Sequence, residues 1–141
     1  MIYLFDTNVL SEAMRDEPHS SVVAWLRDCP ADAMFTTAIS RAEIFYGIRR
    51  LAEGGKRRRL ERAAQAMFGQ EFRDRMLPFD AAAADFYAEL RVLRTQGGRP
   101  IATEDAMIAA VARVHGAAVV TRDAGGFAGC GLVVVDPWAA G

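Results

Sequence analysis

The sequence predicts an α/β domain with a mainly parallel central sheet. Short apolar runs of strand length alternate along the chain with longer segments whose apolar residues recur at helical spacing, which is the pattern of βαβ units. The chain has 141 residues, of which 52% are hydrophobic and 25% charged. These values suit a globular fold with a sizeable core, and because no linker or internal repeat interrupts residues 1–141, we expect a single domain.

The first half of the chain begins with a predicted strand over residues 2–5, a continuous apolar run typical of a buried strand. Asp6 follows the strand and is a typical helix cap. The other elements expected in this half are a helix over residues 22–26, a strand over 33–36, a helix from 40 to 51 and an arginine-rich helix that ends near 73. Ser40 and Glu43 have the capping-box spacing, which predicts that Glu43 caps the backbone of its helix.

The second half of the chain continues the alternation of strands and helices. Asp80 is the predicted cap of a long helix with Phe86, Leu90 and Leu93 on one side, closed by the glycine pair 97–98. The other elements expected here are strands over residues 76–79, 117–121 and 132–135, and a helix over 103–114.

Basic residues are unevenly placed, although the net charge is only −1. A net charge near zero does not by itself indicate a nucleic-acid-binding protein. Arginines nevertheless crowd residues 49–62, where Arg57, Arg58 and Arg59 could contact an RNA backbone or an acidic segment of a partner. The same charges also fit a solvated helix face, and the sequence leaves these interpretations open.

The two cysteines and the N-terminal residues indicate the cellular compartment in which we expect the protein. Cys29 and Cys130 have neither metal-ligand spacing nor the pattern of a secreted disulfide framework. The first residues lack a basic leader, so we expect no signal peptide, and no apolar run approaches the roughly 20 residues that cross a membrane. We therefore expect a cytoplasmic protein without membrane attachment.

Four dispersed acids are the candidate functional residues: Asp6, Glu43, Asp105 and Asp123. Asp6 and Asp123 come just after predicted strands, and open α/β sheets bind ligands outside the carboxyl ends of their strands. Glu43 and Asp105 fall in the first turns of predicted helices. Each acid alone has a simpler explanation, because carboxylates cap helices and turns and favour the helix dipole.

Considered together, the four acids indicate a catalytic metal site. Carboxylates brought close together would raise each other's pKa values, and a divalent cation relieves that repulsion. An all-oxygen ligand set favours Mg²⁺ or Mn²⁺ over zinc, and the only histidines, His19 and His115, lie at predicted helix ends. Because such an ion activates water and polarises a phosphoryl oxygen, phosphodiester hydrolysis is the predicted reaction.

Five ordered motifs resemble the PIN-domain family, and within it the VapC and FitB type of bacterial toxin–antitoxin nuclease. They are residues 4–12, 37–47, 77–80 with Tyr87, 101–110 and 120–127. Each motif alone is weak, and the order and spacing of all five carry the resemblance over nearly the whole chain. It implies a PIN-like three-layer α/β/α fold.

The resemblance also implies roles for particular residues. The family's four catalytic acids map onto the four acids named above, Asn8 matches a position that supports the metal site, and Thr121 matches a hydroxyl that orients it. Many VapC-type chains have Asn at the position of Asp123 and an acid at the position of Gly126. The pattern found here is more similar to the FitB-type subgroup.

The function implied by the resemblance is a Mg²⁺-dependent endoribonuclease toxin, with Mn²⁺ as an alternative ion. Such toxins hydrolyse RNA and are neutralised by a small cognate antitoxin of the VapB or FitA kind. Family members commonly form homodimers through their helices, and their toxin–antitoxin complexes bind promoter DNA through the antitoxin.

Two other functions stay open at this stage. A FitB-like chain could act mainly as a subunit of a DNA-binding repressor complex, with weak or no nuclease activity. Phosphotransfer through an aspartyl phosphate at Asp6 is the other possibility, although haloacid-dehalogenase-type sites need a second Asp where this chain has Asn8. The only lysine, Lys56, lies in a predicted helix rather than at a strand end, and the P-loop motif is absent.

Overall fold

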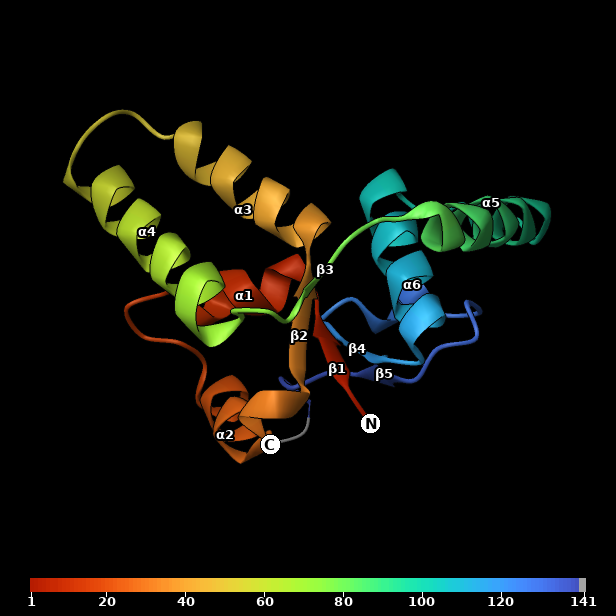
Figure 1. Ribbon diagram of the computed structural model, residues 1–141, viewed down its shortest axis with the longest axis horizontal. Coiled ribbons are helices and arrows are strands. Elements are labelled where there is room, and N and C mark those ends of the chain that lie inside the picture. Colours follow the sequence, from red (N-terminus) through yellow and green to blue (C-terminus); the bar gives the residue numbers. More distant parts are fainter. Residues whose placement is uncertain (140–141) are drawn as a thin grey trace.

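A five-stranded, fully parallel sheet forms the centre of the computed structural model, which describes residues 1–139 (Figure 1). The strands are β1 (Tyr3–Phe5), β2 (Met34–Thr37), β3 (Met76–Leu77), β4 (Ala118–Val120) and β5 (Val134–Val135). They lie in the order β3-β2-β1-β4-β5. The predicted α/β class with a parallel sheet is confirmed.

Helices cover both faces of this sheet (Figure 1). Their bounds are α1 (Thr7–Ala13), α2 (Ser20–Asp28), α3 (Ala38–Arg49), α4 (Gly55–Ala66), α5 (Ala81–Gln96) and α6 (Thr103–His115). Shorter turns are η1 (Ala31–Ala33), the π-helical η2 (Met67–Glu71) and η3 (Ala124–Phe127). Helices α1 to α4 pack on one face and α5 and α6 on the other, which gives the three layers that the sequence resemblance implied. None of these helices, within residues 1–139, has the length and apolar character needed to cross a bilayer.

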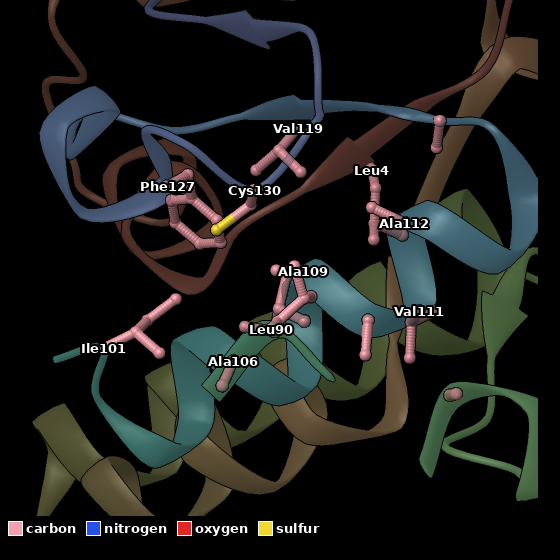
Figure 2. Packing of buried hydrophobic residues seen from close by; sticks show 14 residues of the cluster. Leu4, Leu90, Ile101, Ala106, Ala109, Val111, Ala112, Val119, Phe127 and Cys130 are labelled. Atoms are coloured by element: carbon pink, nitrogen blue, oxygen red, sulfur yellow. The ribbon is translucent and has the colours of Figure 1, made fainter. Parts of the chain in front are cut away.

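Two apolar clusters, one on each face of the sheet, hold the layers together. Leu4 and Val119 belong to the cluster beneath α5 and α6, whereas Phe5 and Val120 belong to the cluster beneath α1 to α4. This alternation follows from the pleat of a strand, which sends successive side chains to opposite faces. Figure 2 shows the first cluster, in which small residues such as Ala109 on α6 lie close to the strands. Each fully buried Leu, Val or Phe stabilises the fold by roughly 1.5–3 kcal/mol relative to exposure.

The chain connections bring several candidate functional residues to one edge of the sheet. From β1 the chain builds outward to β2 and β3, and it then returns to the other side of β1 for β4 and β5. The connections therefore diverge between β1 and β4, which is where open α/β sheets bind ligands. Asp6 follows β1 directly, and Thr121 follows β4.

Helix α3 begins earlier than the sequence pattern predicts, and the predicted capping box is wrong. Thr37 is the N-cap, and its Oγ1 accepts a hydrogen bond from the Ser40 N–H at 3.0 Å. Ser40 therefore lies inside the helix, and Glu43 lies in the second turn rather than the first. The Glu43 carboxylate has no capping role and is available for other contacts.

Helix α5 buries a charged residue where an apolar one was expected. Leu90 is buried as predicted, but Leu93 is 62% exposed, and Arg94 has only 8% of its surface exposed. Other boundaries also differ. The strands predicted over 76–79 and 132–135 are each only two residues long, and the arginine-rich helix passes into a π-helical turn that ends at Glu71.

Candidate functional site

Asp6 lies at the carboxyl end of β1 and is buried, with 5% of its surface exposed. Its Oδ1 accepts a hydrogen bond from the Thr7 N–H at 2.7 Å, and its Oδ2 accepts one from Thr121 Oγ1 at 2.8 Å. Burial raises the pKa of Asp6, these two hydrogen bonds oppose that rise, and the charge of Asp123 adds to it. Asp6 is thus both the cap of α1 and a fixed carboxylate at the sheet edge.

Asn8 and Thr121 connect the end of β1 to the end of β4. Asn8 Nδ2 donates to Thr121 Oγ1 at 3.2 Å and lies 3.4 Å from Asp6 Oδ2, while Asn8 Oδ1 accepts from the Arg122 N–H at 3.2 Å. Thr121 Oγ1 also accepts from the Asp123 N–H at 3.0 Å. The two residues singled out as supporting residues therefore do contact Asp6, and together they hold its carboxylate in one orientation.

Glu43 reaches toward the same edge from α3. Thr7 Oγ1 donates a hydrogen bond to Glu43 Oε1 at 2.7 Å and lies 3.1 Å from Ser40 Oγ. Burial raises the pKa of Glu43, and the negative charges of Asp6 and Glu104 raise it further, while the Thr7 hydrogen bond lowers it. Thr7 therefore donates hydrogen bonds to two of the four acids, from its backbone N–H to Asp6 and from its hydroxyl to Glu43.

Asp105 occupies the first turn of α6, as the sequence predicted. Burial raises its pKa from the ordinary value of 3.8 to about 6, and the negative charges of Asp6, Asp123, Glu43 and Glu104 each add to the rise. Within residues 1–139 no side-chain hydrogen bond holds the Asp105 carboxylate. It is a half-buried acid that faces other acids.

Asp123 follows β4 and combines a turn-forming role with proximity to the other acids. Its Oδ1 accepts a hydrogen bond from the Gly126 N–H at 3.1 Å, which caps η3. A Cβ at Gly126 would overlap the Asp123 carboxylate, so the small residue before Phe127 leaves room for this acid. Many VapC-type chains have an acid at the position of Gly126. In this chain the glycine leaves the space that the Asp123 carboxylate occupies.

Electrostatics show that the four acids are neighbours. The pKa of Asp105 responds to the charges of the other three, and those of Asp6 and Glu43 are also raised. In residues 1–139 no set of three or more acidic, histidine or cysteine side chains stands at metal-ligand spacing. The carboxylates are thus gathered at one edge, where those of Asp6, Glu43 and Asp123 accept hydrogen bonds within the protein and that of Asp105 does not.

A cavity of about 680 Å³ opens beside the acids, between α1, α3 and α4. Thr7 and Glu43 line the end of it that adjoins the acids. The residues that line it include apolar and charged side chains, which are Met14, Ile44, Ile48, Leu51 and Leu60, with Arg15, Asp16, Glu17, Lys56 and Arg59. The cavity thus joins an apolar groove to the edge that carries the carboxylates.

The three arginines predicted as possible RNA or antitoxin contacts differ in position. Arg59 lines the cavity and lies 3.8 Å from Asp16, whereas Arg57 donates a hydrogen bond to the Leu51 carbonyl at 3.4 Å. Arg58 is exposed on α4 and does not line the cavity. Of the three, only Arg59 lines the cavity that Glu43 also lines.

Two residues that contact the site or the segment beside it were not predicted from the sequence. Thr7 was not singled out, although its position directly after Asp6 could have drawn attention to its side chain. Arg94 was not singled out at all, because a charged residue on a helix is ordinarily exposed. Its place beside the segment that follows Asp123 depends on packing between distant parts of the chain.

Comparison with known proteins decides the family. The PIN domain model matches residues 3–129, which is most of the chain. The chain belongs to the PIN-domain family. This PIN domain is 38% identical over 135 residues to Toxin FitB of Neisseria gonorrhoeae, covering 96% of this chain and 97% of that one. It is 33% identical over 135 residues to VapC ribonuclease Y4jK of Sinorhizobium fredii, covering 96% of each chain.

A solved structure agrees with these sequence relatives. The structure of FitAB bound to an IR36 DNA fragment superposes with a TM-score of 0.91 at 37% identity, covering 97% of this PIN domain and 96% of that chain. The predicted resemblance to FitB- and VapC-type toxins is confirmed.

Proposed function

We propose that this PIN domain is a Mg²⁺-dependent endoribonuclease toxin that hydrolyses RNA phosphodiester bonds, with Mn²⁺ able to replace Mg²⁺. The observation that carries the proposal is the group of four acids at one sheet edge, three of which have raised pKa values. Repulsion among them disfavours the charged forms, and a divalent cation would relieve it. The ribonuclease names of relatives such as VapC ribonuclease Y4jK support RNA as the substrate.

The residues present fit a hard divalent cation, because carboxylate oxygens are the ligands that Mg²⁺ prefers. Asp6 and Asp105 would hold the ion, and Glu43 and Asp123 would complete the set directly or through water. When bound, such an ion polarises the scissile phosphate and activates a water molecule for in-line attack.

The chain's own residues supply the orientation that this chemistry needs. The Thr121 hydroxyl and the Thr7 N–H hold the two oxygens of Asp6, and the Thr7 hydroxyl holds Glu43. Such hydrogen bonds fix the geometry of ligating carboxylates and raise metal affinity. The hydroxyl of Thr7 would therefore set the spacing between the Asp6 and Glu43 carboxylates.

Basic side chains near the acids suit a phosphate backbone. Lys56 and Arg59 border the cavity that ends at Glu43, and both are exposed. We infer that Arg59 contacts RNA more directly than Arg57 or Arg58, because only Arg59 of the three lines this cavity.

A small antitoxin of the FitA or VapB kind is the proposed partner. Solved relatives include FitAcB from Neisseria gonorrhoeae and VapBC2 from Rickettsia felis, the latter bound to a DNA fragment from their promoter. The apolar groove between α1, α3 and α4 is a suitable seat, because an antitoxin segment lying in it would cover the approach to Glu43. Any contact with promoter DNA would then be made through the antitoxin.

A second candidate function is favoured by the DNA-bound FitAB structure. In this alternative the PIN domain serves mainly as the subunit that assembles a DNA-binding repressor and has weak or no nuclease activity. It predicts tight operator binding by the complex, measured by gel shift, together with no metal-dependent RNA cleavage by the free toxin.

The proposed activity is tested with purified protein and end-labelled single-stranded RNA. We expect cleavage in Mg²⁺ or Mn²⁺, none in chelator, and reduction to background in Asp6→Asn and Asp105→Asn. Asp85→Asn, which changes an exposed acid on α5, is the matched control and should cleave normally. Cleavage by the wild type in chelator would refute metal dependence, and absence of cleavage on every RNA tried, with intact operator binding, would favour the repressor alternative.

A further inference from the structure

Arg94 is a buried arginine on α5 whose side-chain hydrogen bonds, among residues 1–139, go to backbone carbonyls and a cysteine. Its Nε donates to the Arg99 carbonyl at 2.6 Å, and its Nη1 donates to the Gly126 and Ala128 carbonyls at 2.8 and 2.9 Å. The same Nη1 lies 3.7 Å from Cys130 Sγ. Within residues 1–139 the guanidinium makes no ion pair.

These contacts join two segments that flank two of the acids. Arg99 lies in the connection between α5 and α6, six residues before Asp105. Gly126 and Ala128 belong to the segment 124–130, which follows Asp123 directly. One guanidinium thus ties both segments to α5, because its five N–H donors form a rigid fork that reaches carbonyls in two directions at once.

The link from Arg94 to Asp123 is short. The carbonyl of Gly126 accepts from Arg94, and the N–H of the same glycine donates to Asp123 Oδ1 at 3.1 Å. A Cβ at position 126 would overlap the carboxylate, so this residue is closely fitted between the arginine and the acid.

The segment 124–130 has fewer buried side chains of its own than α6, and arginines hold its carbonyls: Arg94 donates to Gly126 and Ala128, Arg99 to Gly125 and Arg113 to Cys130. Helix α6 is fixed by its own buried face, in which Ala106 and Ile108 are fully buried. The segment contains only the four-residue turn η3, and its large buried side chain is Phe127. Removing the guanidinium would therefore displace Asp123 rather than Asp105.

We propose that Arg94 is a positioning residue that sets where Asp123 stands relative to Asp105 at the metal site. This inference rests on the proposed metal-dependent function. A cation buried without a carboxylate partner is unfavourable for stability alone, and its contacts all lie in the two segments that border the acids. Outer contacts of this kind commonly change metal affinity by about 10–100-fold.

The test is Mn²⁺ affinity, measured by electron paramagnetic resonance on the free protein, in Arg94→Lys and Arg94→Gln. We expect at least about a tenfold loss in both variants with native circular dichroism. Arg91→Lys is the matched control, because Arg91 is exposed on the same helix and contacts only Tyr87 among residues 1–139. Unchanged affinity in the Arg94 variants would overturn the proposal.

A double-mutant cycle with Asp123→Ala separates positioning from general loosening. If Arg94 acts through Asp123, the loss caused by Arg94→Lys falls below about twofold in the Asp123→Ala background. An equal loss in both backgrounds would overturn the proposal.

Gly126→Ala acts on the same link without altering the buried arginine. It should therefore also lower Mn²⁺ affinity, even if the Arg94 variants do not fold, and unchanged affinity would count against the link. If the wild type itself binds no Mn²⁺, the proposed function fails rather than this inference alone.

Discussion

At the scale of single residues, hydrogen bonds decide which acids are held and which are free. The two oxygens of Asp6 accept hydrogen bonds from Thr121 and Thr7, and one oxygen of Glu43 accepts a hydrogen bond from Thr7. Asp105 has burial and negative neighbours but no such support within residues 1–139, and its pKa is raised to about 6. The charged form of Asp105 is therefore unfavourable in the metal-free protein.

The first prediction concerns the pH dependence of stability. Because the folded-state pKa of Asp105 is about 6 against an ordinary 3.8, the folded protein binds more protons than the unfolded chain between these values. Stability therefore falls as pH rises through that window, and the penalty is fully present above it. In chelator, Asp105→Asn should raise Tm by a few degrees at pH 7.5 and leave it unchanged near pH 4, as measured by calorimetry.

The exposed Asp85→Asn serves as the control for that measurement and should show no such pH-dependent gain. A lower Tm for Asp105→Asn at pH 7.5 would mean that the carboxylate stabilises the metal-free fold, contrary to the electrostatics described above.

The second prediction concerns Thr7, whose hydroxyl joins α1 to Glu43. Thr7→Val keeps the shape but removes the donor, so Mn²⁺ affinity should fall by about tenfold. Thr7→Ser retains the hydroxyl and should stay within about twofold of the wild type. Reduced affinity in the serine variant with normal affinity in the valine variant would show that the methyl group, and hence packing, is what matters.

At the scale of elements, α3 contributes Glu43 to the group of acids and also lines the cavity. Gly47 lies on this helix, is exposed, and lines the cavity, and a Cβ added there meets no atom within 4 Å. Glycine inside a helix costs conformational entropy. Position 47 therefore offers a way to change the groove without disturbing the core.

The third prediction uses that position. Gly47→Ala should raise the free energy of unfolding by about 0.5–1 kcal/mol in urea titrations. Gly47→Trp should fold equally well and bind Mn²⁺ normally, yet lose affinity for a FitA- or VapB-like antitoxin in calorimetric titration because the ring occupies the groove. Normal antitoxin binding by the tryptophan variant would place the antitoxin elsewhere.

The sequence predicts most elements correctly because their signals are local. Apolar strands and the caps Asp6 and Asp80 depend on neighbouring residues alone. The start of α3 was missed because Thr37 ends a strand and caps a helix at once, so the capping-box pattern at Ser40 pointed three residues too late.

The site is less predictable because it depends on contacts between distant residues. The contact of Asn8 with Thr121 spans 113 positions, and that of Thr7 with Glu43 spans 36. Composition could not reveal these contacts, and the family resemblance supplied only the identities of the acids, Asn8 and Thr121. The buried Arg94 was missed because the helical pattern gave the inward position to Leu93.

At the scale of the whole molecule, α5 leaves apolar side chains uncovered. Val92 and Leu93 are 55% and 62% exposed and lie on successive positions of this helix. The homodimer implied by the family resemblance stays a prediction, and these side chains are natural contacts for a second copy.

The fourth prediction tests that assembly. Leu93→Asp should shift the free toxin from dimer to monomer in sedimentation experiments and leave Tm of the monomer within a few degrees of the wild type, because Leu93 is not part of either core cluster. Glu89→Gln, an exposed change on the same helix, is the control and should not alter assembly. A dimer that persists in Leu93→Asp would place the interface on another surface.

The proposed activity requires that the four acids form a single metal site. Anomalous diffraction from a crystal soaked in Mn²⁺ tests it most directly. We expect an anomalous peak roughly 2.2 Å from carboxylate oxygens of Asp6 and Asp105, with Glu43 and Asp123 in contact directly or through water. No peak at this edge of the sheet, with Mn²⁺ bound elsewhere or not at all, would contradict the account.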